Sequence, residues 1–333
     1  MKTLAAHAHT LGLTATLVLL AALPTLLGSY HLQLATTVLI YAIFAMSLDL
    51  LVGVTGLVSL GHAAFFGCAA YTLARLSPEF EAVSLWSSLP LAVLSATLAA
   101  LAIGALALRT RGVYFIMVTL AFAQLGYYLV HDTPLGGGSD GVYLYFKPTL
   151  ELFGRNWLDL EQGTSFYALC AAFALLVYLG LQRLLVSSFG ATLGGIRVNE
   201  ARMHSLGYDT FRYKLTAFAI AGGLAGLAGY LSACQYGFVN PEIMSWHTSG
   251  NVLMMVILGG KGRIWGAALG AAALVLLEEW LSDPGLVGAL AEHWQLLLGL
   301  LIVSVVLFAP SGLAGLRWPW PRVATAGATG EAA

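Results

Sequence analysis

Two polar residues stand within or beside long apolar stretches, where an ionisable side chain is a candidate for function. Asp49 follows the apolar run 31–48, and His62 lies between glycines and phenylalanines. Buried ionisable groups in membranes often mark ion or substrate routes, because an unpartnered charge in hydrocarbon is costly. Each also has a structural alternative. Asp49 can hydrogen-bond the glycine turn that follows it, which we favour, and His62 can tie a broken helix to a neighbouring carbonyl.

The residues around His62 predict a break in the chain. Residues 53–67 contain four glycines in an otherwise apolar stretch. This favours a bent or re-entrant segment, which a membrane tolerates only where protein or a water cavity satisfies the backbone. The phenylalanines could contact an aliphatic substrate or serve only in packing. Our candidates for a translocation pathway or gate are Gly61, His62, Phe65, Phe66 and Asp49.

The sequence gives little support for an enzyme. It contains no HExxH zinc motif and no GxxxxGK[ST] phosphate loop. Its three cysteines are far apart and form no CxxC, so we interpret them as packing residues and predict no metal site. We also expect no cofactor. If the protein drives uphill transport, another chain must bind and hydrolyse the ATP.

The composition is that of a membrane protein. Of 333 residues, 59% are hydrophobic and 9% are charged. The balance of 15 basic and 16 acidic residues gives no positive excess, so we expect no nucleic-acid partner. Uncharged apolar stretches recur along residues 1–310, and a span needs ~20 such residues. We predict an all-α polytopic membrane protein with about ten transmembrane helices, some broken or re-entrant, at 11–29, 31–52, 54–76, 85–108, 113–131, 164–185, 215–238, 248–259, 264–282 and 291–309.

The basic residues predict the orientation of these spans. With the N-terminus inside, twelve of the 15 Lys and Arg residues fall on the cytoplasmic side and three fall outside. Residues 132–163 then face out and 186–214 face in. The start of the chain also resembles a signal peptide, but it lacks a small-x-small cleavage site, so we expect a retained first span. We expect 311–333 to form a cytoplasmic tail that is disordered at its end.

Two groups of glycines with similar spacing give a weak indication of an internal repeat. Gly53, Gly56 and Gly61 follow one apolar stretch, as Gly259, Gly262 and Gly266 follow another. Internal repeats are common in transporters. In a chain with 38 glycines, the spacing could equally arise by chance.

Residues 190–209, on the cytoplasmic side, have the pattern of a short amphipathic helix. Leu193, Ile196, Met203 and Leu206 recur at helical intervals, and Gly207 provides a stop. Such a helix could lie on the membrane lipid or dock into a groove of a partner protein.

On the outer side, a glycine-rich run spans residues 136–141. Its consecutive backbone amides could form an anion nest, and an ordinary glycine-rich turn is the simpler interpretation. The four residues that we single out are Gly137, Gly138, Ser139 and Asp140.

Several of these segments together resemble the permease subunits of branched-chain amino acid ABC importers, of the LivM type. The resemblance covers about residues 50–310 in the family's order. Two positions depart from the family's usual pattern, namely Cys68 and Val113. The segments that carry the resemblance are TGLVSLGHAAFFG (55–67), RGVYF (111–115), GGSDG (137–141), IRVNE (196–200), the run 222–229 with Pro241 and Glu242, and VILGGKG (256–262).

The resemblance implies a ten-helix permease in the bacterial cytoplasmic (inner) membrane, with both termini cytoplasmic. Its partners would be a second homologous permease, two cytoplasmic ATPase subunits and a periplasmic substrate-binding protein. The family's coupling helix, which fits an ATPase groove, corresponds here to Ile196, Arg197, Glu200, Met203, Leu206 and Gly207. Residues 132–163 would face the binding protein.

Other functions remain as alternatives. The same family moves urea and short amides, and the binding protein largely sets the substrate. A pentose-type ABC permease shares the architecture but not the motif at 55–67. A secondary transporter would need an ion or proton relay, and Asp49 and His62 alone give little evidence for one.

Overall fold

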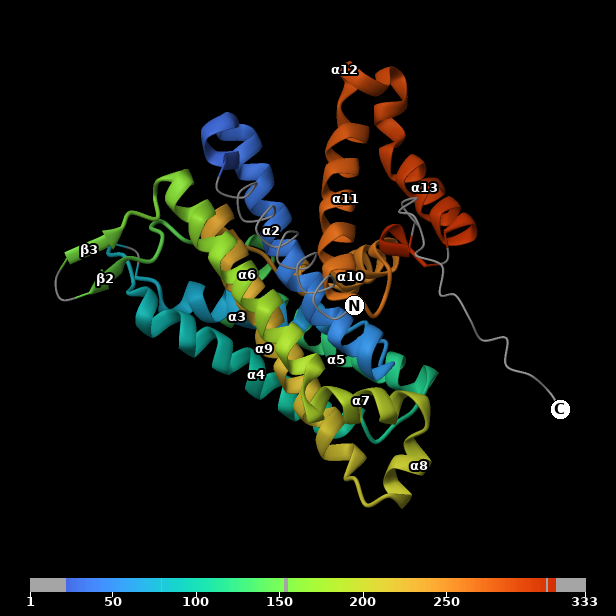
Figure 1. Ribbon diagram of the computed structural model, residues 1–333. Helices are drawn as coiled ribbons and strands as arrows, with labels where there is room; N and C mark the ends of the chain where they lie inside the picture. Colours follow the sequence, from blue (N-terminus) through green and yellow to red (C-terminus); the bar gives the residue numbers. More distant parts are fainter. Residues whose placement is uncertain (1–21, 79, 153–154, 310, 316–333) are drawn as a thin grey trace, which may run out of the picture.

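The computed structural model describes residues 22–78, 80–152, 155–309 and 311–315, and helices dominate this part of the chain (Figure 1). The expectation of an all-α polytopic membrane protein is confirmed. The helices are α2 (Ser29–Asp49), α3 (His62–Leu76), α4 (Leu85–Ala107), α5 (Val113–His131), α6 (Gly163–Val186), α7 (Ser188–Val198), α8 (Glu200–Ser205), α9 (Thr210–Tyr236), α10 (Trp246–Gly259), α11 (Ile264–Ser282), α12 (Pro284–Val287) and α13 (Trp294–Phe308).

The described residues do not test the expected count of ten spans. Within the described residues, seven helical segments are long and apolar enough to cross a membrane. Helix α3 has 15 residues and α10 has 14, fewer than the ~20 that a full crossing needs. Most of the expected first span, and the tail beyond residue 315, lie outside the described residues. The count of ten therefore stays a prediction.

Two small antiparallel pairs of strands complete the fold. Strand β1 (Val142–Tyr143) pairs with β4 (Phe238–Val239), and β2 (Leu150–Leu152) pairs with β3 (Arg155–Leu158). The β2–β3 hairpin and the α7–α8 segment lie at opposite ends of α6 (Figure 1). Which of these two segments faces the cytoplasm stays a prediction.

Helix α9 lies at the centre of the bundle and packs against α2, α3 and α4. Glycines on α9 make this packing close. A Cβ on Gly229 would lie 1.9 Å from the carbonyl oxygen of Phe66, and one on Gly226 would lie 2.4 Å from the Ala96 methyl group. Lipid is as apolar as the helix surfaces, so close van der Waals contact, rather than hydrophobic burial, holds such helices together.

The α10–α11 pair crosses in the same way. A Cβ on Gly259 would lie 1.9 Å from the carbonyl oxygen of Gly266, and one on Gly270 would lie 1.9 Å from that of Met255. Helix α2 packs against this pair and against α9, so it connects the two close crossings.

We predict that Gly229→Ala destabilises the protein, because the added methyl group meets a helix backbone that cannot rotate away. Overpacking of this kind typically costs about 1–3 kcal/mol. Gly180→Ala in α6 is the matched control, since a Cβ there meets nothing within 4 Å. Thermal melting of the purified variants in detergent measures the difference. Equal melting temperatures for the two variants would contradict this packing.

Candidate functional site

The chain breaks between α2 and α3, as the glycine run predicted. Helix α2 continues as one π-helical segment, Leu50–Thr55, and Gly56 ends it with a φ of +76°. Helix α3 begins only at His62. A Cβ on Gly61 would lie 2.3 Å from the carbonyl oxygen of Thr119, so α5 passes close to the break.

His62 is fully buried and connects α3 to α2. Its Nε2 lies 2.8 Å from the hydroxyl oxygen of Ser47, and its ring stacks on Phe44 at 5.5 Å. Phe65 is also buried and packs edge-to-face on Phe218 of α9, with ring centroids 5.5 Å apart. His62 thus ties α3 to α2 through a hydroxyl group and not through the expected neighbouring carbonyl, and its Nδ1 has no partner among the described residues. Whether His62 acts in a gate stays a prediction.

Asp49, the last residue of α2, is also fully buried. Its Oδ1 accepts a hydrogen bond from the backbone N–H of Gly262 at 2.8 Å, in the loop between α10 and α11, and not, as expected, from the glycine turn that directly follows Asp49. Next to it, the Arg197 guanidinium donates to the carbonyl oxygen of Gly53. We call Asp49, Gly53, Arg197 and Gly262 the glycine junction.

The glycine junction joins three segments that are distant in sequence: the π-helical end of α2, the α10–α11 loop and α7. A Cβ on Gly53 would lie 2.1 Å from Asp49 Oδ1 and 2.3 Å from the nitrogen of Gly262, so only glycine fits. Gly53 and Gly262, one glycine from each of the two similarly spaced groups, thus meet here. The sequence repeat itself stays a prediction.

The expected amphipathic helix over 190–209 is two helices, α7 and α8. Asn199 breaks it with extended backbone (φ −156°, ψ 98°), and its side chain caps α8 by accepting from the N–H of Arg202 at 2.9 Å. The stop at Gly207 is confirmed: its φ is +90° and its N–H donates to the carbonyl oxygen of His204 at 2.9 Å.

This break separates the four apolar side chains that were expected on one face. Leu193 and Ile196 are buried against the body of the protein. Met203 contacts α7 at Gly195, where a Cβ would lie 2.8 Å from the Met203 sulfur. Leu206 is exposed. The prediction of a single apolar docking face is therefore wrong, because Asn199 turns α8 relative to α7.

Glu200 has a partner within its own chain. Its carboxylate lies 2.5 Å from Lys214 Nζ of α9 and accepts a hydrogen bond from the Thr210 hydroxyl at 3.2 Å. Partial burial works to raise the pKa of Glu200, but the bond to Lys214 and the nearby positive charge outweigh it and lower this pKa below its ordinary value. The pair holds α8 against the start of α9.

The glycine run 136–141 forms a tight turn that leads into β1. Gly137 and Gly141 both have positive φ, and a Cβ on Gly141 would lie 2.4 Å from the carbonyl oxygen of Val239. Glycine therefore lets β1 approach β4. Ser139 stands in a Gly-x-Ser-x-Gly sequence, yet it lies on an exposed 3-10 turn and its hydroxyl donates to Asp140 at 3.2 Å, so the strand–turn–helix setting of a hydrolase nucleophile is missing at this serine.

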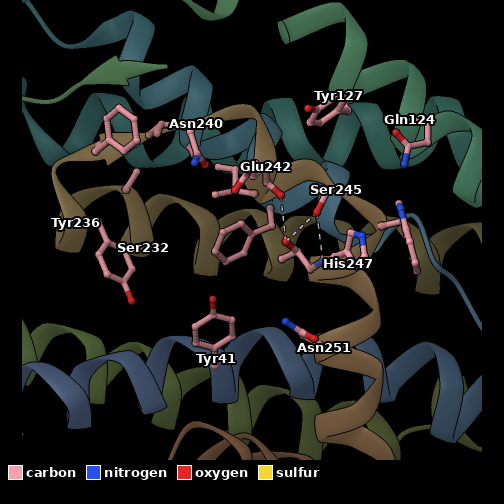
Figure 2. Close-up of a pocket in the computed structure, with 18 of the residues that line it drawn as sticks. Tyr41, Gln124, Tyr127, Ser232, Tyr236, Asn240, Glu242, Ser245, His247 and Asn251 are labelled. Carbon is pink, nitrogen blue, oxygen red and sulfur yellow. Dashed lines mark hydrogen bonds between the residues drawn. The ribbon is translucent and has the colours of Figure 1, made fainter. Parts of the chain in front are cut away.

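A pocket of about 670 Å³ lies among α2, α3, α5, α9, β4 and the start of α10 (Figure 2). Of the proposed gate residues, Phe66 lines it. In Figure 2, Tyr41 on α2 lies across the pocket from Glu242 and Ser245. The lining residues are Tyr41, Phe66, Ala70, Gln124, Tyr127, Tyr128, Ser232, Ala233, Tyr236, Phe238, Val239, Asn240, Glu242, Ile243, Ser245, Trp246, His247, Thr248 and Asn251.

Sequence reasoning identified few residues of this pocket. Glu242 was noted only because it belongs to a segment that resembles the family. Phe66 was a gate candidate only because it lies in the glycine-rich stretch 53–67. A usable signal was present, since residues 240–251 interrupt the apolar pattern with seven polar side chains between two apolar stretches: Asn240, Glu242, Ser245, His247, Thr248, Ser249 and Asn251.

Comparison with known proteins identifies the family. Residues 30–306 match the family described as branched-chain amino acid transport system / permease component. The chain belongs to this family. It is 32% identical to the high-affinity branched-chain amino acid transport system permease protein LivM of Escherichia coli, over 96% of this chain and 78% of LivM.

Two further relatives extend the comparison. The permease protein BraD of Pseudomonas aeruginosa is 25% identical over 83% of this chain and 91% of BraD. The permease protein LivH of Escherichia coli is 32% identical over 110 residues, which cover 33% of this chain and 34% of LivH. No solved structure matches this permease.

We predict a pH-dependent contribution from the pair of Glu200 and Lys214. Because folding lowers the pKa of Glu200, the pair stabilises the fold above the unfolded pKa of about 4.3, and this contribution is lost as the pH falls through the folded pKa. Glu200→Gln should therefore lower the melting temperature at pH 7 and have little effect at pH 3.5. The partly exposed pair is worth at most ~1 kcal/mol.

The control for this measurement is Glu292→Gln, which alters an exposed carboxylate. Melting curves of both variants and the unaltered protein, recorded from pH 7 to pH 3.5, supply the comparison. A deficit of Glu200→Gln that stays constant or grows toward low pH would refute the stabilising role of the ionised pair.

Proposed function

We propose that this chain is a transmembrane permease subunit of an ATP-binding cassette importer that moves branched-chain or related amino acids into the cytoplasm. The observation that carries the proposal is the 32% identity to LivM over 96% of the chain. The sequence has no phosphate loop, so ATP hydrolysis falls to separate subunits. The same family relationship leaves urea and short amides as alternative substrates.

The working assembly contains a second homologous permease, two cytoplasmic ATPases and a periplasmic binding protein that delivers the substrate. The partial match to LivH supports pairing of two related permeases. Exposed apolar side chains along α4 and α5 offer surface for lipid or for this second permease. The excess of basic residues in the loops predicted to be cytoplasmic supports placement in the bacterial inner membrane with both termini inside.

The experiment that tests this function is uptake into vesicles containing the permease pair and the ATPases. With binding protein added outside and ATP inside, radiolabelled leucine should accumulate. The permease chain alone should hydrolyse no ATP. Accumulation of urea or an amide in place of leucine would identify the alternative as the substrate. ATP hydrolysis by the isolated chain would contradict the proposal that separate subunits hydrolyse the ATP.

Coupling to the ATPases is assigned to the exposed side of α7–α8. Val198 is 87% exposed and Leu206 is 65% exposed, one on each side of the Asn199 break. Arg197, adjacent to Val198, reaches the glycine junction through its bond to Gly53. If an ATPase subunit displaces α7 at Val198, the displacement reaches the end of α2 through the bond between Arg197 and Gly53.

We predict that Val198→Asp uncouples ATP hydrolysis from uptake or releases the ATPase. The reason is that the substitution places a charge where an apolar side chain docks into a groove of the ATPase subunit. Glu200→Gln should have a much smaller effect, since Glu200 already pairs with Lys214. Uptake in vesicles and ATPase retention on purification are the two measurements. Unchanged uptake and retention in Val198→Asp would reduce this segment to a membrane-surface helix.

The orientation gives a separate prediction. In a background with its three cysteines replaced, Ser139→Cys should react with an impermeant thiol reagent added outside, and Ser205→Cys only with reagent added inside. Both positions are exposed, so access depends on the side of the membrane alone. The reverse pattern of labelling would invert the topology.

A further inference from the structure

The pocket of Figure 2 contains one charged side chain among its lining residues. That side chain is Glu242, and no Lys or Arg is among the lining residues that the structure describes. Its carboxylate has no hydrogen bond to any described residue, whereas Glu200 is held by Lys214. Glu242 is exposed, so its carboxylate is accessible to a solute in the pocket, where a negative charge attracts a cation.

Glu242 is held in place by its backbone. It lies on the 3-10 turn Pro241–Met244, and its carbonyl oxygen accepts hydrogen bonds from the N–H of Ser245 at 3.0 Å and from the Thr248 hydroxyl at 3.2 Å. The buried Met244 anchors the turn, because a Cβ on Gly67 would lie 2.1 Å from its Cγ. The carboxylate therefore projects from a fixed support.

The other lining groups suit the rest of an amino acid. Phe66, Phe238, Val239 and Ile243 offer apolar surface for an aliphatic side chain, and the Asn251 amide can donate to a carboxylate. The tyrosine and tryptophan rings add cation–π attraction for an ammonium group. The volume of about 670 Å³ falls within the usual range of small-molecule pockets, ~300–1,000 Å³.

We propose that this pocket is an amino-acid site within the permease, and that Glu242 binds the α-ammonium group of the substrate in transit. The proposal rests on the proposed function and names the recognition chemistry. The α-ammonium group is common to all amino acids and absent from urea and neutral amides. The pocket accordingly favours ligands that carry an ammonium group, and its apolar lining accommodates several aliphatic side chains.

The position of the pocket fits delivery from the outer side. Strand β4 lines it at Phe238 and Val239, and β4 pairs with β1 of the outer loop, with Val142 opposite Val239 and Tyr143 opposite Phe238. A substrate released at that loop meets Glu242 before it meets the glycine junction at the far end of α2. Weak binding is expected, because a transport site must also release its substrate.

The test measures binding of radiolabelled leucine to the full complex of permeases and ATPases without the binding protein. Unlabelled 3-methylbutylamine, which keeps the ammonium group, and 4-methylpentanoate, which keeps the carboxylate, are the competitors. The amine should displace leucine and the acid should not. Glu242→Gln should weaken leucine binding by about tenfold or more, as expected for loss of a charged hydrogen-bond partner.

Glu292→Gln, which removes an exposed carboxylate outside the pocket lining, is the matched control and should bind leucine as the unaltered complex does. Equal competition by the acid and the amine would overturn the assignment of Glu242, and so would unchanged binding in Glu242→Gln. The competitor comparison uses the unaltered complex, so it holds even if the variant fails to fold.

Uptake assays separate this inference from the function on which it rests. If the unaltered complex imports leucine with its binding protein but binds none in its absence up to millimolar concentration, the permease site is refuted and the proposed function stands. If the unaltered complex imports no leucine at all, the proposed function itself fails.

Discussion

At Gly229 of α9 the carbonyl oxygen of Phe66 occupies the space that a side chain would need. Comparable approaches occur at Gly226, where α9 meets α4, and at Gly259 and Gly270 between α10 and α11. In lipid these helices gain little from burying apolar surface, so the attraction depends on short backbone distances. The positions of α3, α4, α10 and α11 around α2 and α9 follow from the absence of a Cβ at a few residues.

The same constraint explains how the glycine junction forms. Gly53 can approach Gly262 only because it carries no side chain, and Gly262 needs glycine for its φ of +84°. The N–H of Gly262 faces Asp49, and the carbonyl of Gly53 faces Arg197. A carboxylate and a guanidinium then satisfy backbone groups that the ends of the helices leave open. Asp49 and Arg197 thus stabilise irregular backbone and connect the α10–α11 loop and α7 to the end of α2.

Polar residues in this permease divide into two groups with different surroundings. His62, Ser47 and Asp49 are buried and face protein groups: His62 and Ser47 bond each other, and Asp49 bonds the backbone of Gly262. Glu242 and Asn251 instead line an open pocket, and the structure records no hydrogen bond between their side chains and other described residues. His62 Nδ1 and Asp49 Oδ2 are buried and have no hydrogen-bond partner among the described residues, although the other polar atom of each side chain does. Those bonds hold α2 to α3 and to the α10–α11 loop, whereas the exposed side chains of Glu242 and Asn251 are open to water or a solute.

The sequence by itself determined the class of the protein, its helices and its family, because long uncharged stretches and the motif at 55–67 are local features. It also predicted the break before His62 and the stop at Gly207, since glycine alone adopts such backbone readily. It did not predict the turn at Asn199, where a side-chain cap outweighs the apolar periodicity, nor the partner of Glu200 on α9. Only the tertiary structure decided that the glycine turns meet, and that Tyr41, Phe66 and Glu242 share a pocket, because these contacts join segments up to about 200 residues apart.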